Sequence, residues 1–355
     1  MTVHSLDFDR AVLAVIDGDS PMLQELLRAN SALATVRSVK DHHATLLHYV
    51  AANGVENELQ RVPRNAVEIA TLLLNAGADP HALADIYGGG AGSTPFVGLI
   101  SSSHIREAGL MKALIMCFYE NGANLNGRNA NGLPLATALA FRMEDAVTIL
   151  QESGATLSNI ILAAGCGDLA RVMQMLNAEN LAAYTSPFGE VVEDRPRLLA
   201  GALVAASTFN HRAVIEHLLA QGTNVNARGV TENSTALHEA VKMGYELLVR
   251  FLLDKGANIH LADSQGFMPL HYAAWSGNIP LIDFLLTMGA NLEAKNNYGG
   301  TVLDTLVWRI FNDKSAPDNT IETASHLIES GANVEAVDYP SCDDMINRLL
   351  NRKDV

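Results

Sequence analysis

Two neighbouring stretches of this 355-residue chain decide its fold. Residues 235–258 read TALHEAVKMGYELLVRFLLDKGAN, and residues 268–291 read MPLHYAAWSGNIPLIDFLLTMGAN. Each stretch begins with a helix-start signal, continues with apolar residues at helical spacing, and ends in Gly-Ala-Asn. The second copy follows the first at a period of about 33 residues. A fixed period of this length predicts a stacked repeat array rather than one globule with a single cleft.

The same two marks recur along the chain in both directions. The closing mark appears at Gly77-Ala78-Asp79, Gly122-Ala123-Asn124 and Gly331-Ala332-Asn333, with variants at Gly154-Ala155-Thr156 and Gly222-Thr223-Asn224. The opening mark appears again at Thr45-Leu46-Leu47-His48 and, in weaker form, at Thr94, Leu133 and Thr301. Counting from the opening mark places repeats near Asp9, Thr45, Thr94, Leu133, Ser158, Ala200, Thr235, Met268 and Thr301.

Together the two marks resemble those of the ankyrin repeat, a helix–turn–helix unit joined to the next by a β-turn finger. The resemblance implies an all-α ankyrin-repeat solenoid of about nine repeats, strongest in residues 200–300. The opening Thr is expected to cap the first helix, and the closing Gly to end the second in a left-handed turn. By the same resemblance, His48, His238 and His271 tie their helix starts to adjacent backbone and are structural.

Departures from the regular spacing predict where the array changes. Surplus residues fall between the two helices of a repeat at Val55–Asn65, Ser101–Gly109 and Asn312–Asn319. No finger fits between Gly154 and Ser158, whereas the next one, from Glu179 to Ala200, is overlong. We therefore expect irregular repeats one to four with a cap in residues 1–157, and repeats five to nine with a C-terminal cap in residues 158–355, meeting at an altered angle.

Charge and composition narrow the class of partner. The formal net charge is −15, which disfavours nucleic acid and would steer a basic protein partner, although it could serve solubility alone. The three cysteines lie far apart and no zinc spacing occurs, so we expect neither a metal nor a cofactor. No apolar stretch is long enough for a membrane span, and the N-terminus does not resemble a signal peptide. We expect a monomer in a reducing, cytoplasmic compartment.

The resemblance also implies a concave binding face built from fingers and first helices. Both tryptophans of the chain fall on it, one repeat apart, and aromatic residues are preferred interface anchors. The alternative is that Trp275 and Trp308 stack on each other and serve packing. The expected partner-binding residues are Glu232, Glu239, Lys242, Met243, Gln265, Phe267, Tyr272, Trp275, Ser276, Tyr298, Trp308 and Arg309.

A second candidate site lies in the irregular N-terminal repeats. The glycine-rich run at 87–95 leads into a helix start and could cradle an anion, but it lacks the lysine of a P-loop and could equally be an enlarged finger. Ser101 lies near His104, where capping is the alternative to nucleophilic chemistry. The residues of this possible ligand site are Tyr87, Gly88, Gly89, Gly90, Ser101 and His104, with Cys117 nearby.

Taken together, the sequence favours a non-enzymatic module that binds a protein partner on the finger and first-helix face. Two alternatives stay open. One is a small-ligand binder or enzyme that uses residues 85–117, and the other is an acidic inhibitor or immunity-type protein for a basic partner.

Overall fold

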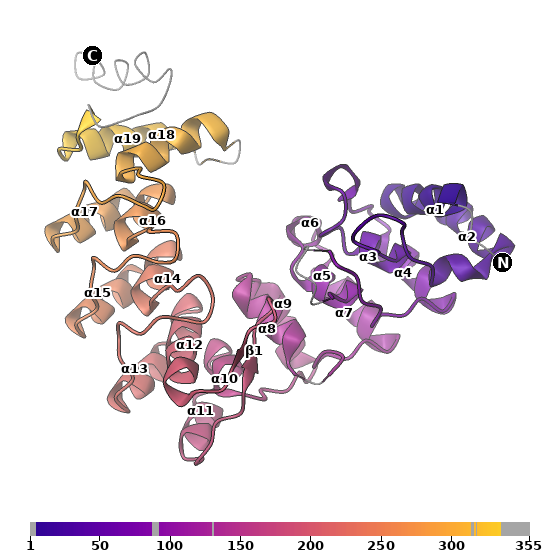
Figure 1. The fold of residues 1–355 in the computed structure, drawn as a ribbon, viewed down its shortest axis with the longest axis horizontal. Helices are drawn as coiled ribbons and strands as arrows, with labels where there is room; N and C mark the ends of the chain where they lie inside the picture. Colours follow the sequence, from indigo (N-terminus) through magenta and orange to yellow (C-terminus); the bar gives the residue numbers. More distant parts are fainter. Residues whose placement is uncertain (1–4, 87–91, 130, 314–315, 317, 335–355) are drawn as a thin grey trace. The chain divides into compact units, whose positions relative to one another are not determined.

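Short helices make up most of the structure (Figure 1). The computed structural model describes residues 5–86, 92–129, 131–313, 316 and 318–334. Within these ranges, the named strands form one antiparallel hairpin, β1 (Tyr184–Thr185) and β2 (Val191–Val192). The expected helical repeat character is confirmed, with this small hairpin added to it.

The chain divides into two compact units. The first comprises Met1–Leu162 and Ala182–Val192, and the second comprises Ala163–Leu181 and Glu193–Val355. The division falls within α10 (Ile160–Gly165). The hairpin belongs to the first unit although the residues before and after it belong to the second, so neither unit is a continuous stretch of chain.

In the first unit, successive helices pack in pairs, and the first helices of the pairs, α1, α3, α5 and α8, pack on one another. The helices are α1 (Ser5–Asp17), α2 (Ser20–Ala29), α3 (Leu46–Val50), α4 (Ala66–Asn75), α5 (Pro95–Ile100), α6 (Ser103–Glu107), α7 (Met111–Glu120), α8 (Leu133–Ala140) and α9 (Glu144–Glu152), with 3-10 turns η1 (Ser31–Ala34) and η2 (Asn57–Leu59). The turn η2 and helix α6 lie within the first two insertions that the spacing predicted.

The second unit repeats the arrangement more regularly. Its first helices α12, α14, α16 and α18 pack in that order, and each also packs on the helix that follows it. The helices are α11 (Leu169–Leu176), α12 (Arg195–Thr208), α13 (Arg212–Ala220), α14 (Ala236–Lys242), α15 (Glu246–Asp254), α16 (Pro269–Trp275), α17 (Ile279–Thr287), α18 (Val302–Asn312) and α19 (Thr320–Glu329).

The first helices begin where the Thr marks predicted. Thr45, Thr94, Thr235 and Thr301 are all N-cap residues in extended conformation. An N-cap hydroxyl satisfies a backbone N–H that has no partner within the helix. At Thr45 and Thr235 a histidine completes a reciprocal capping box, so the predicted structural role of His48 and His238 is confirmed.

The second helices end in the left-handed turn that the Gly marks predicted. The backbone angle φ is +87° at Gly256 and +87° at Gly289, a conformation that costs a residue with a side chain about 1–2 kcal/mol. Before its closing glycine, each second helix buries one apolar stripe, such as Leu248, Val249 and Leu252 on α15. The second helices α13, α15 and α17 are each nine residues long, which keeps their stripes in register from one repeat to the next.

Two helices begin earlier than the repeat starts implied. The described part of α1 is already helical at Ser5, ahead of the repeat start placed near Asp9. The larger correction concerns α12, which begins at Arg195 instead of near Ala200. Asp194 caps it by accepting the backbone N–H of Arg197 at 3.1 Å. This cap, followed by Pro196, starts the helix more than one turn earlier than the repeat register implied.

Membrane-spanning helices and clusters of metal-binding side chains are both absent from the described residues. In the part of the chain that the structure describes, no helix has the length and apolar character that crossing a membrane requires. The same residues contain no group of three or more histidine, cysteine, aspartate or glutamate side chains arranged to hold a metal ion.

Candidate functional site

The candidate site lies on the first helices and fingers of the second unit. Lys242, Trp275 and Trp308 occupy the same position of three successive repeats, at the last residue of α14 and α16 and in the middle of α18. We call these three residues the first-helix row. Because the three helices pack side by side, equivalent positions follow one another across the face. The charge, exposure and contacts of each residue in the row therefore describe the surface that a partner would meet.

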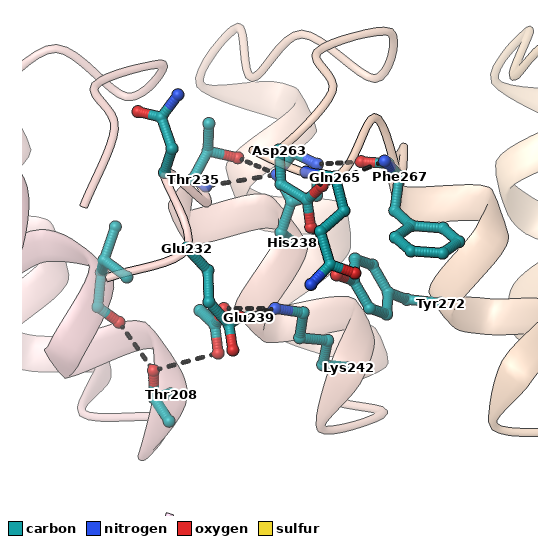
Figure 2. A network of polar contacts seen from close by, with 12 residues as sticks. Thr208, Glu232, Thr235, His238, Glu239, Lys242, Asp263, Gln265, Phe267 and Tyr272 are labelled. Atoms are coloured by element: carbon teal, nitrogen blue, oxygen red, sulfur yellow. Dashed lines mark hydrogen bonds and ion pairs between the residues drawn. The ribbon is translucent and has the colours of Figure 1, made fainter. Parts of the chain in front are cut away.

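Lys242 is held by two carboxylates and an aromatic ring (Figure 2). Its Nζ lies 2.6 Å from Glu232 Oε2 and 3.1 Å from Glu239 Oε1, and 4.4 Å from the centre of the Tyr272 ring. The Glu239 side chain is only 3% exposed, and it also accepts a hydrogen bond from Thr208 Oγ1 at 3.5 Å. A buried carboxylate requires such partners, so Lys242 is part of the interior as well as of the face.

Tyr272 ties this cluster to the next finger. Its hydroxyl donates a short hydrogen bond to Asp263, whose other oxygen accepts the backbone N–H of Gln265 at 2.9 Å and of Phe267 at 3.0 Å. Burial, followed by the Asp263 carboxylate, raises the pKa of Tyr272 above its usual range. The hydroxyl consequently remains a donor, and the finger is fixed in an Asx-type turn.

His238 joins the two repeats at the same place. Its Nδ1 accepts the backbone N–H of Thr235 at 3.2 Å, and its Nε2 lies 3.1 Å from the carbonyl oxygen of Phe267 (Figure 2). The first bond fixes the neutral tautomer with its proton on Nε2, which donates to that carbonyl. Burial lowers the pKa of His238, which favours this neutral form.

The two tryptophans stack on each other. The ring centres of Trp275 and Trp308 are 6.3 Å apart with an interplanar angle of 25°. The guanidinium of Arg309 lies 4.3 Å from the centre of the Trp275 ring, donates to the Trp275 carbonyl, and pairs with Asp313 at 3.0 Å. The packing alternative is thus present in the structure. Trp308 nevertheless remains 49% exposed.

The structure brings most of the expected partner-binding residues together, but not all of them at the surface. Glu239 and Arg309 were expected on the face and are instead buried, 2% and 7% exposed. Each neutralises a charge of opposite sign, which explains the burial. Tyr298 is 77% exposed at the tip of its finger. Gln265 and Ser276 are also exposed, while Met243, Phe267, Tyr272 and Trp275 are half-buried.

Only part of the possible ligand site of the first unit lies within the described residues. Tyr87, Gly88, Gly89 and Gly90 lie outside the described residues. Ser101 is buried, and its hydroxyl lies 3.2 Å from the carbonyl of Val97 and accepts from Asn53 at 2.9 Å. His104 is exposed on α6. The capping expectation for this serine run holds at Ser102, whose hydroxyl accepts the N–H of Ile105 at 3.3 Å.

Sequence reasoning missed Asp263, the residue that anchors the Tyr272 hydroxyl. A signal was present, because Asn296 stands at the same place one repeat later. Its Oδ1 accepts the backbone N–H of Tyr298 at 2.9 Å and of Gly300 at 3.1 Å, as Asp263 does in its own finger. An aspartate or asparagine in this register marks a side chain that organises the finger.

Known proteins similar to this chain point the same way. Residues 202–296 match the family described as ankyrin repeats (3 copies). The fowlpox virus ankyrin repeat protein FPV031 is 44% identical over 69 residues, 19% of this chain and 20% of that protein. Palmitoyltransferase AKR1 of Lachancea kluyveri is 39% identical over 66 residues, 19% of this chain and 9% of that protein. The B-cell lymphoma 3 protein homolog of Mus musculus is 26% identical over 278 residues, 75% of this chain and 51% of that protein.

The chain thus spans about half or less of the length of these relatives. The matched family covers the region where the repeat marks are most regular, as the sequence predicted. Thr-capped first helices tied by histidine, second helices ended by glycine, and this match together show a chain that resembles the ankyrin-repeat family, whose repeats serve as protein–protein interaction modules.

Proposed function

We propose that the first-helix row and its neighbouring fingers bind a protein partner without catalysing a reaction. The observation that carries the proposal is the exposure of Trp308 and Tyr298 on a face where Lys242, Tyr272 and Arg309 are held by ion pairs and hydrogen bonds. Large aromatic side chains lose little conformational entropy on binding and bury much area, so they dominate interface energies.

The fingers support this proposal because they are fixed before any partner arrives. The backbone N–H of Ser264 donates to the Glu232 carbonyl at 2.9 Å, and that of Asn297 donates to the Gln265 carbonyl at 2.9 Å. The Asn297 side chain adds a bond to the Ser264 carbonyl at 3.0 Å. A face that is already ordered loses less entropy on binding, which leaves more of the contact energy as affinity.

The spacing of the repeats suggests how many repeats there are and how they are arranged. We infer about nine repeats, in blocks 1–157 and 158–355, acting as a monomer with a concave finger and first-helix face. The net charge of −15 favours a basic protein over nucleic acid as partner. A selection of peptides that bind the chain distinguishes a role of this negative charge in binding from a role in solubility alone.

The test is capture of a partner from a native extract with three versions of the full chain. Wild type is compared with Trp308→Ala plus Tyr298→Ala, and with Leu247→Ala as control, since Leu247 is 81% exposed on a second helix. Trp275 is left intact because it packs on Arg309. A partner lost only from the double variant supports the face. A partner retained by it and lost from Leu247→Ala would place binding elsewhere.

A further inference from the structure

Trp308 is the last member of the first-helix row among the described residues. Trp275 stacks against it, and no described repeat with an equivalent position follows α18. The ring is 49% exposed, the largest exposure of either tryptophan. An indole in this position carries a negative face that attracts cations, and indole is the best of the aromatic rings for such contacts.

The face already holds basic side chains on two aromatic rings, Tyr272 and Trp275, which both lie on α16. Lys242 lies 4.4 Å from the Tyr272 ring centre and within hydrogen-bond distance of Glu232 and Glu239 (Figure 2). Arg309 lies 4.3 Å from the Trp275 ring centre and 3.0 Å from Asp313. Both arrangements combine a cation, a ring and a carboxylate. Trp308 occupies the position of Trp275 in the next repeat.

The charges of this face favour a basic occupant over an acidic one. The two cations nearest the rings, Lys242 and Arg309, are each neutralised within the protein and largely buried, with side chains 11% and 9% exposed. Glu232 is 49% exposed, although it pairs with Lys242. The whole chain carries a net charge of −15. This net charge favours a partner that brings a positive charge.

We propose that the partner segment is a basic peptide that places an arginine guanidinium on the exposed side of the Trp308 ring; this rests on the protein-binding function proposed above. Arginine fits better than lysine because its planar, weakly hydrated guanidinium stacks on an indole and still donates hydrogen bonds at its edge. Arg309 on Trp275 shows the same pairing inside the protein.

The experiment selects random linear peptides, displayed on phage, on the full-length chain. Recovered peptides are synthesised with each arginine kept or replaced by citrulline, which has nearly the same shape but no charge. Binding is followed through tryptophan fluorescence, a direct readout here because the chain has only two tryptophans and both lie in this cluster. Each peptide is titrated into wild type, Trp308→Ala, Trp308→Phe and Phe311→Ala, with intrinsic tyrosine emission or calorimetry used where tryptophan is removed.

Phe311 is the matched control, since it lies on the same helix and is 45% exposed but is not in the row. We expect recovered peptides to contain arginine. Both Trp308→Ala and citrulline should weaken binding about tenfold, whereas Trp308→Phe should restore part of the loss. Phe311→Ala should change affinity less than twofold.

Three other results would overturn the inference. Recovered peptides that need Trp308 but are acidic or uncharged, or that tolerate citrulline, would reject the basic occupant and leave the binding face intact. Peptides indifferent to both Trp308→Ala and Tyr298→Ala would reject the face as well. Protection of the free full-length chain from acrylamide quenching would mean that another part of the chain, such as residues 335–355, already covers the ring.

Discussion

The imidazole Nε2 of His238 lies 3.1 Å from the carbonyl oxygen of Phe267, so a side chain in one repeat is hydrogen-bonded to the finger of the next. His48 makes the equivalent bond to the carbonyl of Ser93 in the first unit, also at 3.1 Å. Both histidines donate through Nε2 because Nδ1 accepts the N–H of the capping threonine. Protonation of Nδ1 would break the bond from the threonine N–H, so this capping arrangement depends on neutral imidazole.

This arrangement predicts that the protein loses stability in mild acid. Burial lowers the pKa of His48 and of His271 from 6.5 to about 4, and that of His238 in the same direction. A histidine with a lowered pKa in the folded state contributes its full stability above pH 6.5 and loses it as the pH falls towards 4. For His48 or His271 the loss is at most about 3 kcal/mol.

Urea unfolding followed by circular dichroism between pH 7.5 and 4.5 measures this effect. His48→Gln keeps a side chain that can complete a capping box but does not titrate, so the dependence on pH should become shallower. His104→Gln, at an exposed position, is the control and should leave the slope unchanged. Equal slopes for wild type and His48→Gln would refute the role given to this imidazole.

Lys242→Met should be strongly destabilising, by about 3–5 kcal/mol, because it leaves the buried Glu239 carboxylate without its cation. Adding Glu239→Gln should recover much of the loss. A double-mutant cycle from urea unfolding gives the coupling between the two residues. Lys112→Met is the control, since its pair with Glu152 is exposed at both ends and should contribute less than about 1 kcal/mol. Similar losses at Lys242 and Lys112 would contradict the buried pair.

Gly266→Ala should cost clearly more than Gly256→Ala, although both glycines have a positive φ, +83° and +87°. A Cβ at Gly256 would meet nothing within 4 Å, so only the backbone strain of about 1–2 kcal/mol remains. A Cβ at Gly266 would meet the backbone nitrogen of Asn297, which bonds the neighbouring finger. Comparing their unfolding midpoints tests this difference. Equal midpoints would show that the fingers are not closely packed there.

The sequence predicted the parts of the fold that are encoded locally. An N-cap such as Thr235 and a left-handed glycine such as Gly256 need only their own few neighbours, so their residue types reveal them. Insertions were also found, because they change a spacing that is otherwise constant. The start of α12 was misplaced because Asp194 and Pro196 override the repeat register within a long finger.

The position of the candidate site stays a prediction from the sequence, and the contacts among its residues were not predicted. Register along the first helix could have revealed the burial of Glu239. Tyr49 and Thr305 occupy the equivalent place in their repeats and are 2% and 7% exposed. The contact of Arg309 with Trp275 depends instead on how two successive repeats pack, and no local pattern encodes that. To predict that a charged residue such as Arg309 is buried, one must therefore know the position of the residue that it contacts as well as its own.

The hairpin β1–β2 has a consequence for how the protein emerges during synthesis. Its residues, Ala182–Val192, complete the first unit, yet Ala163–Leu181 of the second unit are made before them. Domains generally fold as they are synthesised, starting from the N-terminus. We therefore expect the first unit to be completed only after Val192 has left the ribosome, when part of the second unit has already been made. A fragment cut at residue 157 would remove this closing segment from the unit that it completes.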